Sequence, residues 1–423
     1  MMLAIAVVGA GTAGAAAATL LARARHTVTV FERVAEPRPV GAGITLQPTG
    51  QVALARLGIL DAIAARAARI DRLTAVRANG KPLIDLWYGD VDPRLYGLGT
   101  HRGVLFETLL GALQGEAVKL RFGIAIAGTD TNAQGRWLVD KQGHRYGPFD
   151  LVVAADGSTS ELHSAAPLLY DRPYSWGAAW IVADDPGFAA ENRIWQIVDG
   201  CHTLLGFLPT GSGPGRETPV VSMFWSMRVD RVEAWRAAGI GAWRDRVLRL
   251  EPRAEPILDT VDDLASVVFT RYRDVSMDPW HGDRIVFLGD CAHAMSPQLG
   301  QGANLALVDA VALADALAAH EAVPGALAAY SAARRRHLAF YQFMTRALTP
   351  LFQGDSRVLG WLRDRTFPIS RWLRFVRYRM TRAMVGIDRG IIRRPFPVGE
   401  IVRQLPELPA ADPAPPRVRT IDT

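Results

Sequence analysis

Three glycines near the start of the 423-residue chain stand at a spacing that suits dinucleotide binding. Gly9, Gly11 and Gly14 form a GxGxxG pattern between the apolar runs "LAIAVV" and "AAAATLLARAR". The first glycine permits a tight turn, the second lets the backbone approach a pyrophosphate, and the third lets a helix pack on a strand. Glu32 ends the next apolar run, where a carboxylate can bind a ribose hydroxyl. The pattern predicts a βαβ unit that binds NAD or FAD.

A second glycine-rich loop, far downstream, favours FAD. The segment "FLGDCAHAMSPQLGQGANLALVDA" (287–310) joins an apolar strand to an apolar helix. Asp290 could accept hydrogen bonds from a ribityl chain, and Gly300 and Gly302 let backbone N–H groups approach the pyrimidine edge of a flavin. A helix that begins near Ala303 would point its positive end at that edge, where reduced flavin carries negative charge. A plain strand-to-helix connector is the alternative for this loop taken alone.

This loop resembles the second FAD signature of the class A flavoprotein monooxygenases, which share the para-hydroxybenzoate hydroxylase fold. Residues 1 to about 345 carry the resemblance, which includes "GAGITLQPTGQVALARLGIL", Arg102 in "HRGVL" and Asp156-Gly157 in "VVAADGSTSELH". His163 stands where the family usually has Arg or Lys. The resemblance implies FAD contacts by Gly9, Gly11, Gly14, Glu32, Arg33, Gly43, Arg102, Asp156, Gly289, Asp290, Pro297, Gly300, Gln301, Gly302, Ala303 and Asn304.

The resemblance also implies a reaction. NADH or NADPH would reduce FAD, O2 would form a flavin hydroperoxide, and one oxygen atom would enter an aromatic, phenolic or polycyclic small molecule. Pro297 would wall the oxygen cavity, with Gly300 and Gly302 beside the flavin. Epoxidation, Baeyer–Villiger-type insertion and N-hydroxylation stay open, and a noncatalytic FAD-binding protein is a further alternative. Halogenation is disfavoured, because the chain has no WxWxIP motif and only three lysines.

The residues that would contact the substrate are less clearly indicated. The alternating, aromatic-rich sequence from about 170 to 271 predicts an antiparallel sheet. Its candidates for the pocket wall are Trp180, Trp195, Phe207, Met223 and Trp225, with ordinary sheet core as the alternative for at least half of them. No catalytic base is identified, and the conceivable ones are His101, His202, His281, Tyr96, Tyr174 and Tyr272. Cys291 and His293 are assigned no catalytic role.

These residues require an α/β (α+β) chain with a Rossmann-like FAD-binding domain, an inserted antiparallel β-sheet substrate domain and C-terminal helices. The length also exceeds what one hydrophobic core usually fills. The expected FAD-binding domain is discontinuous and comprises residues 1–72, 98–170 and 272–345. The expected substrate domain comprises 73–97 and 171–271, the helical region 346–405 and a Pro-rich flexible tail 406–423.

The cysteine content and the apolar segments indicate where in the cell the protein is expected. Two cysteines, Cys201 and Cys291, cannot form a disulfide framework and have no metal-ligand spacing, so no metal and a cytoplasmic location are expected. The N-terminus reads as a first strand and not as a signal peptide. The most apolar stretch, "ANLALVDAVALADALAA", contains Asp309 and Asp315 and does not predict a membrane span.

The C-terminal region is strongly basic. Residues 334–403 hold sixteen arginines against four acids, with aromatic residues among them. After Pro368, Ile369, Trp372, Leu373, Val376 and Met380 recur at helical spacing. A helix packed on the body with a solvated basic face is one interpretation, and peripheral membrane contact is the other. Nucleic-acid binding is not expected, because no recognisable module accompanies the charge. The oligomeric state stays open.

Overall fold

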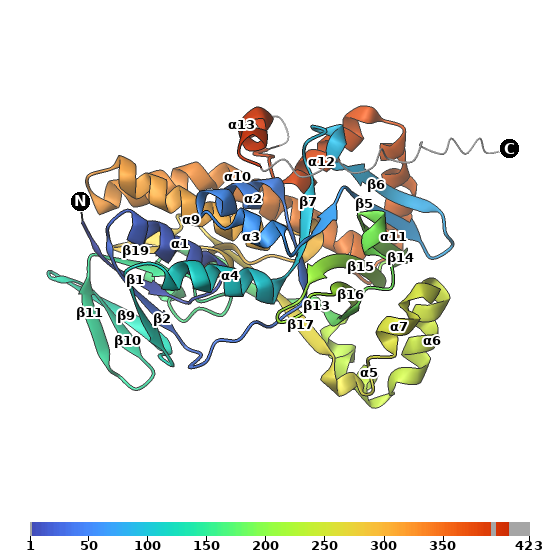
Figure 1. Cartoon of the computed structure of the whole chain (residues 1–423), viewed down its shortest axis with the longest axis horizontal. Coiled ribbons are helices and arrows are strands. Elements are labelled where there is room, and N and C mark those ends of the chain that lie inside the picture. Colours follow the sequence, from blue (N-terminus) through green and yellow to red (C-terminus); the bar gives the residue numbers. More distant parts are fainter. Residues whose placement is uncertain (1, 391–394, 406–423) are drawn as a thin grey trace.

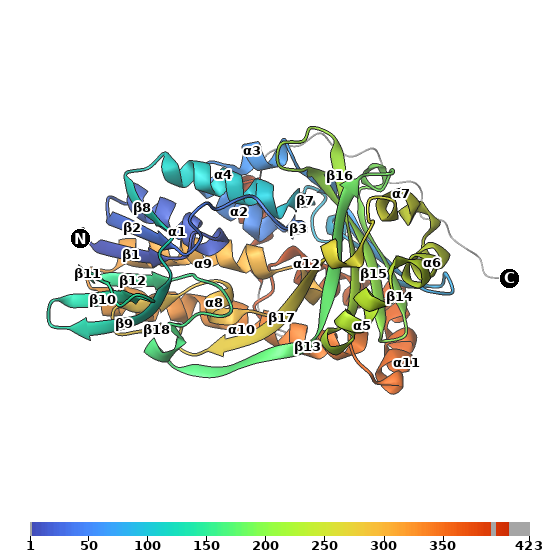
Figure 2. The same ribbon diagram turned by 90° about the horizontal axis from the view of Figure 1, so that it is seen from below.

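The structure is a computed structural model that describes residues 2–390 and 395–405. The tail expected at 406–423 therefore lies outside the described residues. The elements fall into two halves, each built on a large sheet, and strands β13 and β17 run from one half into the other (Figure 2).

The N-terminal half is a Rossmann-like sheet, as the sequence predicts. Its order is β18-β19-β12-β1-β2-β8, and all neighbours are parallel except β18 and β19. The strands are β1 (Ala4–Val8), β2 (Thr27–Glu32), β8 (Val118–Phe122), β12 (Leu151–Ala154), β18 (His281–Gly282) and β19 (Ile285–Phe287). Since helices and a small antiparallel sheet cover its faces, the central strands are apolar throughout.

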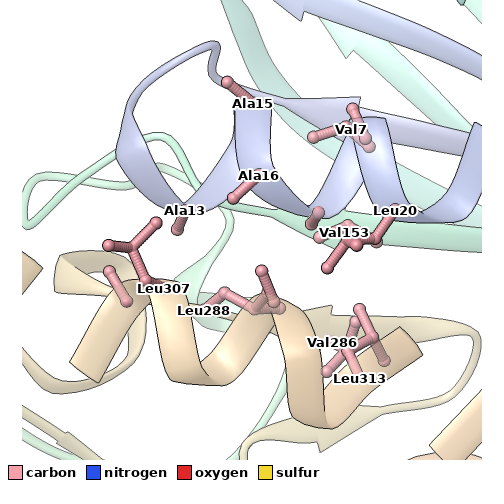
Figure 3. Packing of buried hydrophobic residues seen from close by; sticks show 14 of the residues in the cluster. Val7, Ala13, Ala15, Ala16, Leu20, Val153, Val286, Leu288, Leu307 and Leu313 are labelled. Atoms are coloured by element: carbon pink, nitrogen blue, oxygen red, sulfur yellow. The ribbon is translucent and has the colours of Figure 1, made fainter. Parts of the chain in front are cut away.

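Two helices pack closely beside this sheet. Helix α1 (Thr12–Arg23) presents Ala13, Ala16 and Leu20, and helix α9 (Gly302–Ala319) presents Leu307 and Leu313 (Figure 3). The alanines allow close approach, so segments nearly three hundred residues apart form one core. Among the described helices, α9 alone has the length and mean hydropathy of a membrane span, and half of that stretch is buried inside the protein.

Smaller elements complete this half. They are the three-stranded sheets β11-β10-β9 and β3-β7-β4 and several helices. Their bounds are β3 (Gly43–Leu46), β4 (Ala68–Ile70), β7 (Gly97–His101), β9 (Ile126–Asn132), β10 (Gly135–Asp140), β11 (Arg145–Phe149), α2 (Pro48–Arg56), α3 (Leu60–Ala64), α4 (Arg102–Gln114), α8 (Asp290–His293) and the 3-10 turn η7 (Pro297–Leu299).

The second half is a seven-stranded sheet of order β17-β13-β16-β15-β14-β5-β6. All pairs in it are antiparallel except β14 with β5. The strands are β5 (Arg72–Arg77), β6 (Pro82–Trp87), β13 (Leu168–Asp184), β14 (Arg193–Asp199), β15 (Thr203–Ser212), β16 (Pro219–Arg228) and β17 (Val268–Met277). Strands β5 and β6 thus share one sheet with strands from beyond residue 168, and the division into discontinuous domains stays a prediction.

The two faces of this sheet are covered differently. The outer face packs on α5 (Val232–Ala237), α6 (Ile240–Leu250) and α7 (Glu255–Leu258). The inner face packs on the end of α10 (Val323–Phe352) and on α12 (Arg374–Val385). Figure 1 shows α5 to α7 on one side of the sheet and α11 and α12 on the other. The C-terminal helices therefore cover the face that is turned toward the glycine-rich loops.

The basic region does not form one continuous amphipathic helix. Helix α11 (Arg357–Thr366) leads into the 3-10 segment η8 (Phe367–Arg371), and α12 begins only at Arg374. Helix α13 (Val398–Arg403) follows. The predicted apolar stripe is consequently divided, because Met380 packs toward the inner face whereas Ile369 and Trp372 are exposed.

Replacing Gly14 with alanine should loosen α1 from β1, because the added Cβ would lie 1.9 Å from the carbonyl oxygen of Gly9. We expect the free energy of unfolding of the cofactor-free protein to fall by about 1–3 kcal/mol, as for other overpacked sites. Gly11→Ser is the matched control, since nothing lies within 4 Å of an added Cβ there and serine caps helices well. Thermal unfolding measures both variants, and an unchanged midpoint in Gly14→Ala would contradict this packing.

Candidate active site

Four predicted residues meet at the carboxyl edge of the Rossmann-like sheet. Gly9 follows β1, Glu32 ends β2, Asp156 follows β12 and Asp290 follows β19. These strands are parallel, so their carboxyl ends lie at the same edge, where open α/β sheets bind ligands. The residues come from distant parts of the chain, and only the sheet brings them together.

The first glycine loop has the geometry that its sequence predicts. Gly9 has a positive φ of 98°, and a Cβ there would meet the carbonyl oxygen of Ala155 at 2.5 Å. Gly11 is exposed at the N-cap of α1, in open space. The first N–H groups of the helix therefore face a region that a phosphate can approach.

Glu32 organises the turn around this loop. Its carboxylate oxygens accept hydrogen bonds from the backbone N–H groups of Ala10 and Val34, each at 2.9 Å. Beside it lies a cleft lined by Val8, Gly9, Phe31, Glu32, Arg33, Ile124, Ala125, Ile126, Lys141, Asp156, Thr159 and Glu161. One carboxyl oxygen of Asp156 is buried there without a hydrogen-bond partner, and burial raises the pKa of this side chain.

The second loop is held open by its neighbours. Gly300 has φ +61° and open space at its Cβ position, and both Pro297 and Gly300 are exposed. Asn304 accepts a hydrogen bond from the N–H of Gln47 (2.8 Å) and donates to the carbonyls of Thr45 and Gly300 (3.0 Å each). This amide joins β3 to the loop, and the open space at Gly300 leaves room for a ligand beside the loop.

The C-terminal region also anchors this loop. The side-chain amide of Gln301 donates to the carbonyl oxygen of Met384 at 2.7 Å. Gly386 approaches so closely that a Cβ there would meet the hydroxyl of Thr49 at 2.4 Å and the amide oxygen of Gln301 at 3.2 Å. Residues beyond α12 therefore form part of the wall around the predicted flavin loop.

A buried network of charged and polar side chains holds the start of the second glycine-rich loop. Asp309 in α9 accepts hydrogen bonds from the N–H of Gly289 (2.9 Å), from Nε2 of His293 (2.5 Å) and from Nε of Arg334 (2.6 Å). Arg334 also donates to Nδ1 of His337 (2.7 Å), whose Nε2 donates to the carbonyl of Gly386 (2.8 Å). Burial alone would raise the pKa of Asp309, but the charges of His293 and Arg334 hold it at about 2.

The other predicted cofactor residues occupy different places. Arg33 lines the cleft, and Arg102 is exposed at the start of α4, where its side chain lies against Gly41. Gly43 instead faces the seven-stranded sheet, because its N–H donates to the hydroxyl of Ser222 at 2.7 Å and a Cβ would meet Thr210. Ala303 follows Gly302 in the first turn of α9 and is half-buried.

The structure separates the five predicted pocket residues. Phe207, Met223 and Trp225 belong to the outer-face core with α5 to α7, and Trp195 packs against that core. A strand alternates its side chains between two faces, so these four side chains point away from the glycine loops. Trp180 lies on the inner face with Phe224, their ring centroids 5.1 Å apart. Phe224, whose ring lies over Gly206, is not among the pocket residues predicted from the sequence.

Most of the conceivable bases lie away from the inner face. His101 accepts the cap hydrogen bond of α4, His281 contacts Ser331, His202 is half exposed near Asp355, and Tyr96 packs under Arg69. Tyr272 lies beside Trp180, and Tyr174 lies beside Ser296, Asp274 and Thr349. Burial raises the pKa of both tyrosines, so their hydroxyls are protonated at neutral pH and can donate but not remove a proton.

Comparison with known proteins identifies the family. A family described as "FAD binding domain" matches residues 2–342. The chain is 31% identical over 334 residues to 3-amino-4-hydroxybenzoate 2-monooxygenase of Streptomyces cremeus, covering 76% of this chain and 80% of the relative. It is 28% identical over 355 residues to kynurenine 3-monooxygenase of Stenotrophomonas maltophilia, covering 78% and 75%. This chain belongs to the class A flavoprotein monooxygenases.

A solved structure agrees with this family. P. aeruginosa PqsL, in complex with 2-aminobenzoylacetate, superposes with a TM-score of 0.74 at 25% identity, covering 86% of this chain and 100% of PqsL. The chain is therefore an FAD-dependent monooxygenase, with NADH or NADPH as the reductant. The predicted family, fold and cofactor are confirmed.

The residues of the flavoprotein monooxygenase fit FAD. Gly11 offers an open helix N-terminus for the phosphates, and Asp156 has a buried oxygen without a partner at the same edge. Asp290 is exposed at the end of β19, where a ribityl chain would lie, and Gly300 offers a backbone without side-chain cover. The network of Asp309, Arg334 and His337 is not among the features predicted from the sequence. The available signal was an acid, Asp309, among the apolar residues of the first half of α9.

Gly11→Ser should weaken FAD binding while it leaves the cofactor-free fold intact. The added side chain occupies the space through which a pyrophosphate approaches the helix N-terminus. We expect the Kd for FAD to rise at least about tenfold, which corresponds to about 1.4 kcal/mol. Quenching of flavin fluorescence during titration measures this, and wild-type affinity in the variant would contradict the assigned phosphate position.

Asp309→Asn should lower the free energy of unfolding by about 3–5 kcal/mol, because it leaves Arg334 buried without its counter-charge. The pKa of Asp309 in the folded chain, about 2, lies below the ordinary 3.8. Its stabilising contribution is thus complete above about pH 4 and is lost as the pH falls toward 2. Acid unfolding of the variant should therefore show a shallower dependence on pH in this window.

Asp315→Asn is the matched control for Asp309→Asn. Asp315 lies on the same helix but is half exposed, and its ion pair with Arg56 is at the surface. Surface pairs contribute about 0–1 kcal/mol, so this variant should unfold much like the wild type. An equal fall in the free energy of unfolding in the two variants would show that the buried network stabilises the protein no more than a surface ion pair does.

Proposed function

We propose that this flavoprotein monooxygenase inserts one oxygen atom from O2 into an aromatic ring that bears an amino or hydroxyl group. The observation that carries the proposal is the inner face of the seven-stranded sheet, where Trp180, Phe224 and Tyr272 are turned toward the half that holds Pro297 and Gly300. Support also comes from two similar proteins, 3-amino-4-hydroxybenzoate 2-monooxygenase and PqsL in complex with 2-aminobenzoylacetate. Both compounds contain an aromatic ring that bears an amino group.

The proposed roles follow from position. FAD, when bound, would supply the redox chemistry that NAD(P)H and O2 require. Gly9, Gly11 and Gly14 shape the turn that would hold its phosphates, and Glu32 positions the turn through Ala10 and Val34. The N-terminus of α9 directs its positive end toward the exposed loop, where it stabilises negative charge.

On the substrate side, the chain mainly excludes water and orients the ring. The exposed ring of Pro297 would wall the space next to the loop, as the family resemblance implies. Trp180 and Phe224 would contact the substrate ring, because their own rings are packed together and only partly buried. Protonated Tyr272 or Tyr174 would donate a hydrogen bond to a substrate oxygen. Such positioning raises the rate without a separate base.

We further propose that the Arg-rich C-terminal helices contact a membrane surface. The support is the exposure of Trp361, Trp372 and Phe375 among arginines of α11, η8 and α12. Apolar side chains in a basic setting favour the interface of a bilayer. A peripheral position would suit an aromatic substrate that partitions into lipid.

The reaction is tested with FAD-loaded protein and a panel of aminobenzoates, aminobenzoyl compounds, phenols, naphthols and quinolones. Stimulated oxidation of NADH or NADPH, and a product that gains one oxygen atom from isotope-labelled O2, is the expected result. Oxidation that yields only hydrogen peroxide with every compound would contradict the proposed oxygenation.

Phe224→Ala should raise the KM for the accepted aromatic substrate about tenfold, since it removes an aromatic contact of the order of 1 kcal/mol beyond lost burial. Met223→Ala is the matched control on the same strand, because its side chain belongs to the outer-face core. That variant should lose stability but keep the KM. Initial rates over a range of substrate concentrations measure both, and an equal change in KM would contradict the assignment of the faces.

A further inference from the structure

Several large apolar side chains are exposed on the C-terminal elements. Six of them, here called the C-terminal patch, are Trp361, Leu362, Ile369, Trp372, Leu373 and Phe375. Trp372 and Phe375 are 79% and 76% exposed. The six side chains lie on α11, η8 and α12 and on the two residues between η8 and α12, and η8 contacts both helices. They lie in the half of the molecule away from the N-terminus (Figure 1). Such a cluster marks an interaction surface, whereas scattered exposed apolar residues do not.

The charge around the C-terminal patch is uncompensated. Arg357, Arg365, Arg371 and Arg374 are exposed, and none of them is in an ion pair within the part of the chain that the structure describes. The acid between them in sequence, Asp364, is already bonded to Arg363. An occupant of this surface must therefore offer both apolar volume and negative charge.

A hollow at the edge of the C-terminal patch also combines arginine and aromatic side chains. It measures about 260 Å³ and is lined by Asp90, Arg374, Phe375, Arg377 and Tyr378. Arg377 is paired with Asp90 at 2.9 Å, whereas Arg374 has no ion pair among the described residues. A phosphate group next to Arg374 would lie beside the ring of Phe375, which is the arrangement of an anionic headgroup above an acyl chain.

We propose that the C-terminal patch docks the enzyme onto a bilayer that contains anionic phospholipids. Tryptophan and phenylalanine insert at the level of the headgroups, and arginines bind the phosphates around them. A second copy of the chain fits less well, because a symmetric contact through this face would bring the four arginines of each copy together. The inference rests on the membrane contact proposed above and adds its surface and its lipid chemistry.

The C-terminal patch is connected through α12 to the inner face of the seven-stranded sheet, where the substrate is proposed to bind. Helix α12 carries Phe375 near its start, and Trp372 lies two residues before the helix. Near the end of α12, Met384 packs on the inner-face core, and its carbonyl oxygen accepts the hydrogen bond of Gln301 at 2.7 Å. Tyr341 donates to the carbonyl of Ala383 at 3.0 Å, which holds that end in place. A lipid-dissolved aromatic substrate would thus reach the protein within one helix length of the wall of the proposed pocket.

Vesicle co-sedimentation of the full, FAD-loaded chain tests the inference. The probes are vesicles of phosphatidylcholine alone and of phosphatidylcholine with phosphatidylglycerol. Binding to the anionic vesicles alone, weakened by salt, is the expected result. Arg371→Gln with Arg374→Gln should weaken it about fivefold for each arginine. Trp372→Ser with Phe375→Ser should abolish sedimentation even at low salt.

The control is Val268→Ser with Arg249→Gln, which removes one exposed apolar side chain and one exposed arginine outside the C-terminal patch. It should bind vesicles like the wild type. Equal binding to both vesicle types, no binding to either, or an equal loss in the control would overturn the proposal. So would a wild-type dimer in light scattering that becomes a monomer in Trp372→Ser with Phe375→Ser, or tighter binding to RNA than to anionic vesicles.

The two proposals fail separately. Turnover of a water-soluble aromatic compound does not need the C-terminal patch, so all three double variants should keep FAD and this activity. If the protein binds vesicles but oxygenates none of the compounds, only the proposed reaction is contradicted. If it oxygenates a compound but does not bind vesicles, only the proposed docking surface is contradicted.

Discussion

The buried charge of Asp309 is the constraint on which the arrangement of this monooxygenase depends. An acid at the centre of an apolar helix is stable only with partners, because an unpaired charge in a protein interior is very costly. Here the partners are the N–H of Gly289, the imidazole of His293 and the guanidinium of Arg334. One carboxylate thereby sets the start of the second glycine loop and its distance from α9 and α10.

The same network reaches the C-terminal region. Arg334 bonds to His337, and His337 bonds to the carbonyl of Gly386. Burial lowers the pKa of His337 well below its ordinary value, so the ring is neutral and can accept from Arg334 while it donates to the carbonyl. Together with the hydrogen bond from Gln301 to Met384, this couples the segment after α12 to the loop that would hold the flavin. The C-terminal helices are thus connected by hydrogen bonds to the loop of the candidate site.

The two faces of the seven-stranded sheet explain which aromatic residues can matter for the substrate. Successive side chains alternate between the faces, so Met223 and Trp225 join the helical layer while Phe224, between them, joins the inner face. The composition of the segment shows that aromatic residues are abundant but not which face they occupy. Four of the five pocket residues predicted from the sequence consequently belong to, or pack on, the outer core.

The features that depend on local backbone geometry could be predicted from the order of residues along the chain. A helix N-terminus near a phosphate, a turn with positive φ at Gly9 and a strand that ends in Glu32 need particular residues at short spacing, so their positions can be read along the chain. The partners of Asp309, the inner position of Phe224 and the break between η8 and α12 that exposes Trp372 became known only from the folded chain. These depend on contacts between segments hundreds of residues apart, and local patterns carry no information about which distant segments meet.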